Sequence, residues 1–277
     1  LLTLKTIDDS VETLYRLLES QGVLDQTYFY YTSDQGYHLG QNGLGLDKRQ
    51  PWETDLRVPA YLRGPGVPTN LTVDALVGHV DITASFLDMA GADPDAVMEQ
   101  LGAPPLDGES FLPKIDLFSK IHSGQLPPSA AKGVRDTLLF EYNGEHNDAG
   151  GSTPECSHLT DPNLNCYAQR QHDKPPFFNG TSFCSCQDVT NNTYHGLRNH
   201  VPQPLSQDGP SEIYTEFVTD FKEYYDVQAD PWQVSNLYSK LDPSRQASLH
   251  STLEALHTCT GASCGRSSYP SGIQSIR

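Results

Sequence analysis

Long apolar runs and basic residues are both scarce in this sequence of 277 residues. It has no uncharged apolar stretch of about 18 residues, which excludes an ordinary membrane-spanning helix. Its 18 basic side chains face 35 acidic ones, and the net charge of -17 argues against nucleic acid as a general partner. The sequence also lacks a starting Met and the features of a signal peptide, so we expect a processed chain or a fragment.

Cysteine is absent from the first half of the chain, whereas the second half has six. An even number among Gly, Pro and Asn residues predicts disulfides formed in an oxidising compartment. Cys259 and Cys264 are the expected local pair, and three pairings are open to the others, Cys156, Cys166, Cys184 and Cys186. N-glycosylation sequons favour the same secretory route and begin at Asn70, Asn179 and Asn191.

The first part of the sequence alternates between helix and strand patterns. Apolar residues recur at helical spacing over 7–21, and Gly22 follows in the position of a left-handed cap. The run 27–32 is continuously aromatic and β-branched, which is typical of a strand buried on both faces of a parallel sheet. A further strand is predicted at 58–63, and a helix at 80–90 with Asp81 as its N-cap. This order indicates an α/β fold.

We predict two regions with a boundary near residue 135. Residues 1–135 would belong to a large mixed sheet flanked by helices. Residues 136–277 would form a smaller, disulfide-stapled subdomain with an antiparallel sheet and a closing helix at 244–258.

The residues best suited to chemistry lie in the loop after the strand at 27–32. Asp34 stands where ligands of open α/β sheets bind, and Gln35 beside it offers a second oxygen, so the pair suits a hard cation such as calcium. His38 and Lys48 on the same loop would hold the oxygens of a sulfate or phosphate. Between Arg16 and Lys114 the basic residues are confined to one short stretch, Lys48, Arg49, Arg57 and Arg63, which favours an anion site.

These residues stand in motifs that resemble a known family. The stretches SDQGYHLGQ, DKRQPWETDLRVPAYLRGPG, VDITASFLDMAG, LDGESFLP and EYYDVQADPWQVSNLY are similar to the type I sulfatases of the alkaline-phosphatase-like superfamily, in their C-terminal half. The resemblance implies that Asp34 and Gln35 bind calcium, although the family usually has Asn or His in place of Gln35. It implies catalytic roles for Lys48 and His38, and substrate contacts for Arg49, Glu53 and Arg57.

The same resemblance implies a formylglycine nucleophile made from Cys/Ser-x-Pro-x-Arg. No Cys or Ser of this sequence stands in that pattern, so we expect the formylglycine, and the paired Asp ligands, on an N-terminal portion. The implied activity is hydrolysis of sulfate esters in a lysosomal or extracellular setting. A narrower likeness in LLFEYNGE, NNTYHGLRN and HTCTGASCG points to the 6-O-sulfate of N-acetylglucosamine in heparan or keratan sulfate.

Two alternatives stay open at this point. One is a phosphodiesterase or phosphonate hydrolase built on the same scaffold. The other is a catalytically silent secreted binding module, which the missing nucleophile and the unusual Gln35 would favour. The expected partners are a sulfated glycosaminoglycan and the N-terminal portion of the same enzyme.

Overall fold

The computed structural model describes residues 2–43, 46–144, 164–169, 183–189, 192–202 and 210–276. Its helices are α1 (Leu2–Ser20), α2 (Glu53–Leu56), α3 (Ile82–Met89), α4 (Pro94–Leu101), α5 (Leu112–His122) and α6 (Pro243–His257). Its strands are β1 (Phe29–Thr32), β2 (His38–Leu39), β3 (Leu46–Asp47), β4 (Ala60–Arg63), β5 (Thr137–Tyr142), β6 (Leu164–Gln169), β7 (Phe183–Val189), β8 (Tyr194–His200), β9 (Ser211–Phe217) and β10 (Lys222–Asp226). None of the described helices is long and apolar enough to cross a bilayer.

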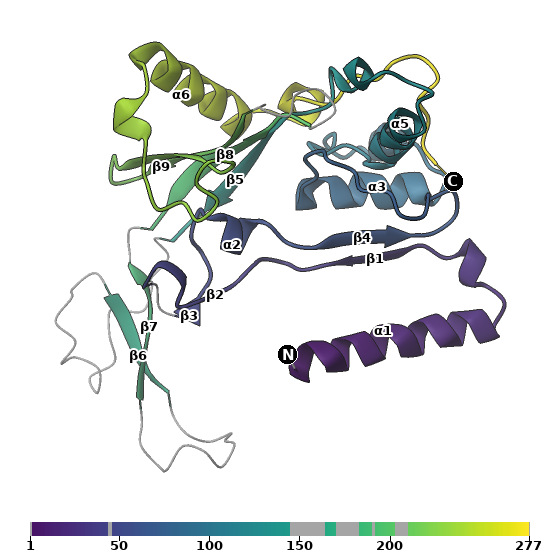
Figure 1. Ribbon diagram of the computed structural model, residues 1–277, viewed down its shortest axis with the longest axis horizontal. Coiled ribbons are helices and arrows are strands. Elements are labelled where there is room, and N and C mark those ends of the chain that lie inside the picture. The colour runs from purple at the N-terminus through teal and green to yellow at the C-terminus, as the bar shows by residue number, and fades with distance from the viewer. Residues whose placement is uncertain are drawn as a thin grey trace.

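Strand β1 pairs with β4, and the two run antiparallel with Phe29 opposite Arg63 and Thr32 opposite Ala60. Helices α3 and α5 lie along one face of this pair, as Figure 1 shows, where Tyr30 packs against Phe86 and Phe111. On the other face Tyr31 and Tyr61 are 39% and 69% exposed.

Within the described residues β1 pairs with β4 in the antiparallel direction and its second face is partly exposed, so the prediction of a parallel strand buried on both faces is wrong there. An unbroken apolar run indicates burial on both faces only when all its side chains avoid water. Tyrosine has a hydroxyl group and tolerates contact with water, so the run in β1 is compatible with one partly exposed face.

Helix α1 lies along β1 on the side away from α3 (Figure 1). Tyr15 contacts Phe29, and the Arg63 guanidinium lies 5.5 Å from the centre of the Tyr15 ring. Gly22 has a φ of 69°, and the amides of Gly22 and Val23 bond back to Glu19 and Leu18, so the predicted left-handed helix end is confirmed.

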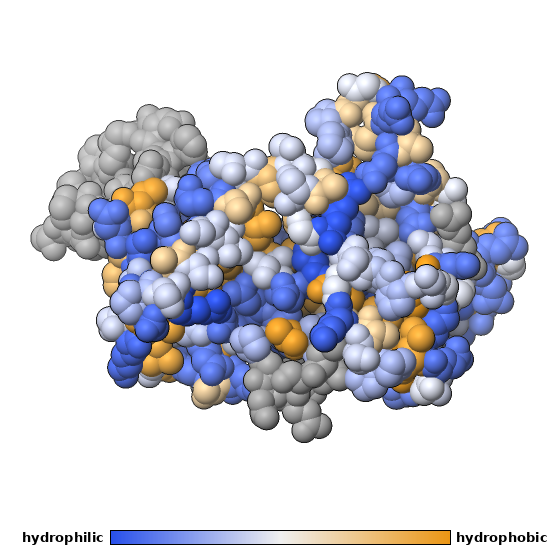
Figure 2. Space-filling view, turned by 90° about the horizontal axis from the view of Figure 1, so that it is seen from above, coloured by the Kyte–Doolittle hydropathy of each residue, from blue (hydrophilic) through white to orange (hydrophobic). Residues whose placement is uncertain are grey.

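The second part contains a four-stranded antiparallel sheet in the order β10-β9-β8-β5. Helix α6 covers one face, and the two elements share a core of Leu197, Tyr214, Tyr224, Leu249 and Leu253. The predicted antiparallel sheet and closing helix are thus confirmed. On the face of the molecule shown in Figure 2, hydrophobic residues form small separate patches among hydrophilic ones.

The chain after α6 returns to the first part. The predicted disulfide between Cys259 and Cys264 is present. Beyond it Arg266 contacts both carboxylate oxygens of Asp95 at 2.6 and 2.9 Å, and Lys120 Nζ donates to the Gly272 carbonyl at 2.8 Å. The side chains of Cys156, Cys166, Cys184 and Cys186 lie outside the described residues, so their pairing stays a prediction, as does a domain boundary near 135.

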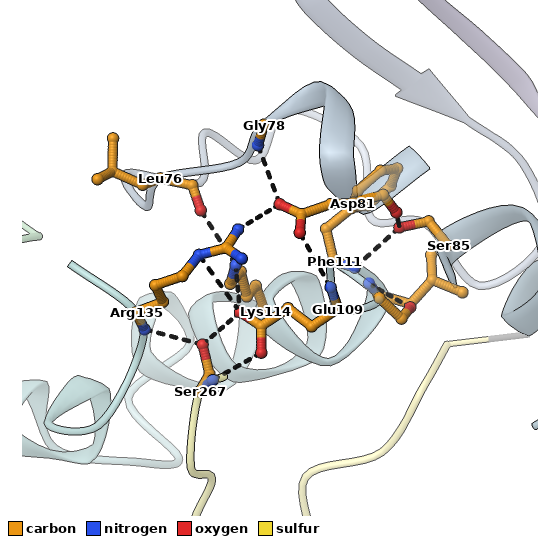
Figure 3. Close-up of polar contacts among 11 residues, drawn as sticks. Leu76, Gly78, Asp81, Ser85, Glu109, Phe111, Lys114, Arg135 and Ser267 are labelled. Carbon is orange, nitrogen blue, oxygen red and sulfur yellow. Dashed lines mark hydrogen bonds and ion pairs between the residues drawn. The ribbon is translucent and has the colours of Figure 1, made fainter. Parts of the chain in front are cut away.

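A buried network of charged residues connects these segments (Figure 3). Asp81 pairs with Arg135, and Lys114 Nζ lies 2.7 Å from Glu109. Lys114 also donates to the Leu76 carbonyl at 3.0 Å, and burial lowers the pKa of its ammonium group.

Asp81 does not cap α3 with its side chain, contrary to the prediction. Its carboxylate instead accepts from the backbone amides of Gly78 at 2.9 Å and Glu109 at 3.0 Å, together with Arg135. The reason is geometric: Asp81 already has helical backbone angles, φ -84° and ψ -14°, whereas a capping residue has extended ones.

Candidate functional site

Asp34 follows the end of β1, and its side chain is exposed. Its carboxylate oxygens accept hydrogen bonds from the Gln35 backbone amide at 3.0 Å and from Gln35 Nε2 at 2.9 Å. The side-chain bond from Gln35 lowers the pKa of Asp34, and the charge of Lys48 lowers it further. The carboxylate is therefore held ionised at the surface, in the form that binds a cation.

The loop after Asp34 is fixed against α2 by its backbone. The Gly36 amide donates to the Asp55 carbonyl at 2.7 Å, and the Tyr37 amide donates to the Thr54 carbonyl at 3.0 Å. A Cβ atom on Gly36 would lie 1.8 Å from the Thr54 carbonyl oxygen. Only glycine allows this approach, so residue 36 sets how closely the Asp34 loop lies on α2.

His38 is 2% exposed and belongs to an inner contact of the same loop. Its Nδ1 donates to the Asp55 carboxylate, at 3.0 and 3.1 Å from the two oxygens. Asp55 is itself 5% exposed and also accepts from the Gln50 amide at 2.9 Å. The pair therefore joins the start of the loop at His38 to its end at Gln50, on either side of Lys48.

Lys48 is half-buried and lies on the same loop as Asp34 and Gln35, and its charge is one of the causes that lower the pKa of Asp34. Arg49 has a φ of 104°, a conformation that costs energy for a residue with a side chain. Its carbonyl accepts from Asn192 Nδ2 at 3.1 Å, and Asn192 is 4% exposed. The residue after Lys48 is thus anchored to the segment that leads into β8.

Glu53 and Arg57 have different surroundings from the Asp34 group. Glu53 Oε1 lies 2.8 Å from Arg198 Nε, and the Glu53 amide donates to Gln233 Oε1 at 2.7 Å. Arg57 reaches only to 3.8 Å from Glu53, and its side chain is 80% exposed. Glu53 therefore joins α2 to the C-terminal sheet, while Arg57 points into solvent.

Sequence reasoning missed three residues that support this loop: Asp55, Asn192 and Arg198. Asp55 lies in the motif DKRQPWETDLRVPAYLRGPG. An acidic residue in a motif on the same stretch as His38 is the available signal for a partner of that histidine. Nothing in the sequence pairs Asn192 or Arg198 with a loop about 150 residues earlier. Of the three predicted glycosylation sites, Asn70 is exposed, and Asn179 and Asn191 lie outside the described residues.

Comparison with known proteins gives the setting of this loop. The model of the Sulfatase family matches residues 1–92, which include the whole Asp34–Lys48 segment. N-acetylglucosamine-6-sulfatase from Bos taurus is 34% identical over 264 residues, which cover 95% of this chain and 40% of the relative. The chain thus spans about two fifths of the length of that relative.

Solved structures show the same fold. One, described as a complex with its substrate D-glucosamine-2-N,6-O-disulfate, has a TM-score of 0.57 and 22% identity, and the likeness covers 91% of this chain and 38% of the other. The phosphonate monoester hydrolase of Agrobacterium radiobacter has a TM-score of 0.59 and 18% identity, covering 91% and 39%. At these identities the likeness concerns the fold alone.

Fold, family match and relatives agree on one class: the chain has the α/β fold of the alkaline-phosphatase-like superfamily and is similar to the type I sulfatases. The sequence-based resemblance is thereby confirmed. Over nearly its whole length the chain is similar to N-acetylglucosamine-6-sulfatase.

Proposed function

We propose that this chain is the C-terminal portion of a sulfuric ester hydrolase that removes the 6-O-sulfate of N-acetylglucosamine in heparan or keratan sulfate. The observation that carries the proposal is the grouping of the exposed, ionised Asp34 with Gln35 and Lys48 on one loop. The loop thus offers an anionic oxygen for a cation and a cationic donor for an anion, which is what binding a sulfate through a metal ion requires.

The donor set around Asp34 fits calcium in part. Calcium takes about six to eight oxygen ligands, and this loop offers the Asp34 carboxylate and the Gln35 amide oxygen. Gln35 now donates with its Nε2, and a half-turn of the amide would turn its oxygen toward an ion bound by Asp34. The remaining oxygens would come from the paired Asp ligands expected on the N-terminal portion. When bound, the ion would polarise a sulfate oxygen.

Lys48 would contact the sulfate oxygens and stabilise the charge that develops on the leaving oxygen. A lysine acts there as a compact cation, and its electrostatic stabilisation of the sulfate charge is stronger where water is excluded. Arg49 and Arg57 add positive charge at the edge of the loop and would contact the sulfated sugar. Glu53 would support the loop through its ion pair with Arg198 on β8.

His38 would act chiefly by positioning. Because its Nδ1 is bound to Asp55 inside the protein, the His38–Asp55 pair would hold the two ends of the loop that carries Lys48. The formylglycine nucleophile is expected on the N-terminal portion, so this chain would supply binding and charge stabilisation, and its partner segment the covalent chemistry.

A secretory location, lysosomal or extracellular, goes with this proposal. The Cys259–Cys264 disulfide and the exposed Asn70 of a glycosylation sequon support it.

The test is turnover by the full-length Lys48→Ala protein. We expect kcat for a 6-O-sulfated N-acetylglucosamine substrate to fall about 100- to 1000-fold, the usual cost of losing one charge-stabilising donor. The matched control is Lys132→Ala, which removes an exposed lysine far along the chain and should leave kcat unchanged.

Near-normal turnover of Lys48→Ala would remove Lys48 from the proposed mechanism. Wild-type protein that cleaves a phosphonate monoester but no sulfate ester would favour the phosphonate hydrolase alternative. Wild-type protein that binds sulfated glycosaminoglycan without cleaving any ester would favour the silent binding module.

A further inference from the structure

Two histidines and one glutamate meet at one point on the C-terminal sheet. Glu141 on β5 and His195 on β8 stand directly opposite each other in the strand register, and His257 is the last residue of α6. Glu141 Oε1 lies 2.5 Å from His257 Nδ1 and 3.7 Å from His195 Nε2. The two imidazole rings are 4.2 Å apart between their centres.

This arrangement differs from an ordinary ion pair. One carboxylate oxygen of Glu141 faces two imidazole rings, so three side chains present possible ligand atoms to the same small space. A metal cation could be bound between them, because imidazole nitrogen and carboxylate oxygen are both common metal ligands. No sulfate-binding or catalytic role proposed above uses these three residues.

The ligand atoms are close to the spacing that a metal ion requires. All three lie within 4.8 Å of one another. Two ligands bound tetrahedrally at about 2.0–2.1 Å from zinc are about 3.3 Å apart. The contact between Glu141 and His257 would open slightly and that with His195 would close slightly. The side chains are 31–40% exposed, so they have room to adjust.

The chain around the cluster holds it in place. Glu141 and His195 sit on two hydrogen-bonded strands, and the Cys259–Cys264 disulfide begins two residues after His257. The Gly261 amide inside that disulfide loop donates to Asp107 at 2.6 Å. The carboxyl end of α6 also carries the negative end of the helix dipole, which favours a cation at His257.

We propose that Glu141, His195 and His257 form a binding site for a first-row transition metal and that the bound ion is Zn²⁺. Two nitrogen donors favour zinc over calcium or magnesium, which prefer oxygen. Partial exposure leaves a fourth position for water. Because the site joins the end of α6 to β5 and β8, zinc would stabilise this sheet.

The experiment is a zinc titration of the full-length protein without a histidine tag, in excess calcium so that oxygen sites are filled. We expect one zinc equivalent per chain and a higher Tm with zinc present. Cobalt(II) in place of zinc should give the visible absorption bands of a site with nitrogen ligands. The variants His195→Ala and His257→Ala should each weaken zinc binding by about tenfold or more.

The matched control is His250→Ala. His250 is also on α6 and also contacts a carboxylate, with its Nδ1 2.8 Å from Glu216 Oε1, and it is 50% exposed. Circular dichroism would show that all variants fold. The proposal is overturned if the wild type takes up no zinc, if both cluster variants bind zinc as the wild type does, or if His250→Ala loses as much affinity. Asp34→Asn should leave zinc binding unchanged, which separates this site from the proposed calcium site.

Discussion

The charged side chains of this molecule differ in their surroundings: one group is buried, whereas Asp34 is exposed on its loop. Asp81, Glu109, Lys114 and Arg135 are between 0% and 8% exposed, and each faces an opposite charge. Asp34 is exposed, and its nearest partner is the amide of its own neighbour, Gln35. The buried charges are all paired with each other and stabilise the fold, while the Asp34 carboxylate remains accessible to a ligand.

The difference shows what makes a carboxylate structural. Asp81 accepts two backbone amides and a guanidinium, so its oxygens have no room for anything else. A third case lies between the two: Glu223 is 9% exposed, and burial raises the pKa of its carboxyl, while hydrogen bonds from Tyr225 and Trp52 offset part of the shift. Four substitutions test this comparison, from the largest expected effect on stability to the smallest.

Asp81→Ala should have the largest effect. It leaves Arg135 buried without its partner and frees the amides of Gly78 and Glu109. Removing one member of a buried pair costs about 3–5 kcal/mol, which urea unfolding would measure. A loss below about 1 kcal/mol would mean that the network contributes little and that water satisfies Arg135.

Gly36→Ala should be next. The added Cβ would meet the Thr54 carbonyl oxygen at 1.8 Å, so the Asp34 loop must move away from α2. We expect a loss of about 1–3 kcal/mol in the free energy of unfolding. Activity should fall as well, since Lys48 moves with the loop. An unchanged unfolding midpoint would show that the loop is not held against α2.

Glu223→Gln should change the pH dependence of stability. A folded-state pKa above the unfolded value of 4.5 means that Glu223 favours folding below pH 4.5 and that this contribution is lost as pH rises through the folded pKa. The neutral amide avoids that loss, so Tm of the variant relative to wild type should rise between pH 4.5 and pH 7. Glu99→Gln, an exposed control on α4, should show no such trend. A pH-independent difference for Glu223→Gln would refute this account.

Asp34→Asn should have the smallest effect on stability, within about 0.5 kcal/mol, because the side chain is exposed. It should nevertheless weaken calcium binding to the full-length protein by about tenfold or more, since calcium affinity follows ligand charge. Isothermal titration calorimetry would measure this. Asp25→Asn, which changes a 96% exposed carboxylate, serves as control. Unaltered calcium affinity would remove Asp34 from the ligand set.

Much of the local structure was predictable, because it depends on neighbouring residues. The helix end at Gly22 and the Cys259–Cys264 disulfide follow from short-range geometry, and the resemblance located the Asp34 loop. The antiparallel pairing of β1 and the role of Asp81 were not predictable, since both depend on which distant segments pack nearby. The same holds for the contacts of Glu53 with Arg198 and Arg49 with Asn192, which join residues about 145 positions apart.

The return of the chain after α6 has a consequence for how the protein is made. Residues 266–276 complete the first part: Ser267 binds Glu109 at 2.6 Å, Lys120 binds Gly272, and Tyr28 Oη donates to the Ile276 carbonyl at 3.3 Å. During synthesis, these contacts cannot form while only the residues before 266 have left the ribosome. Until residues 266–276 have emerged, the α3–α5 region lacks the bond from Arg266 to Asp95 and the bond from Ser267 to Glu109. A chain that ends before residue 266 would therefore be destabilised in its earlier part, the α3–α5 region, although the missing residues lie at the other end.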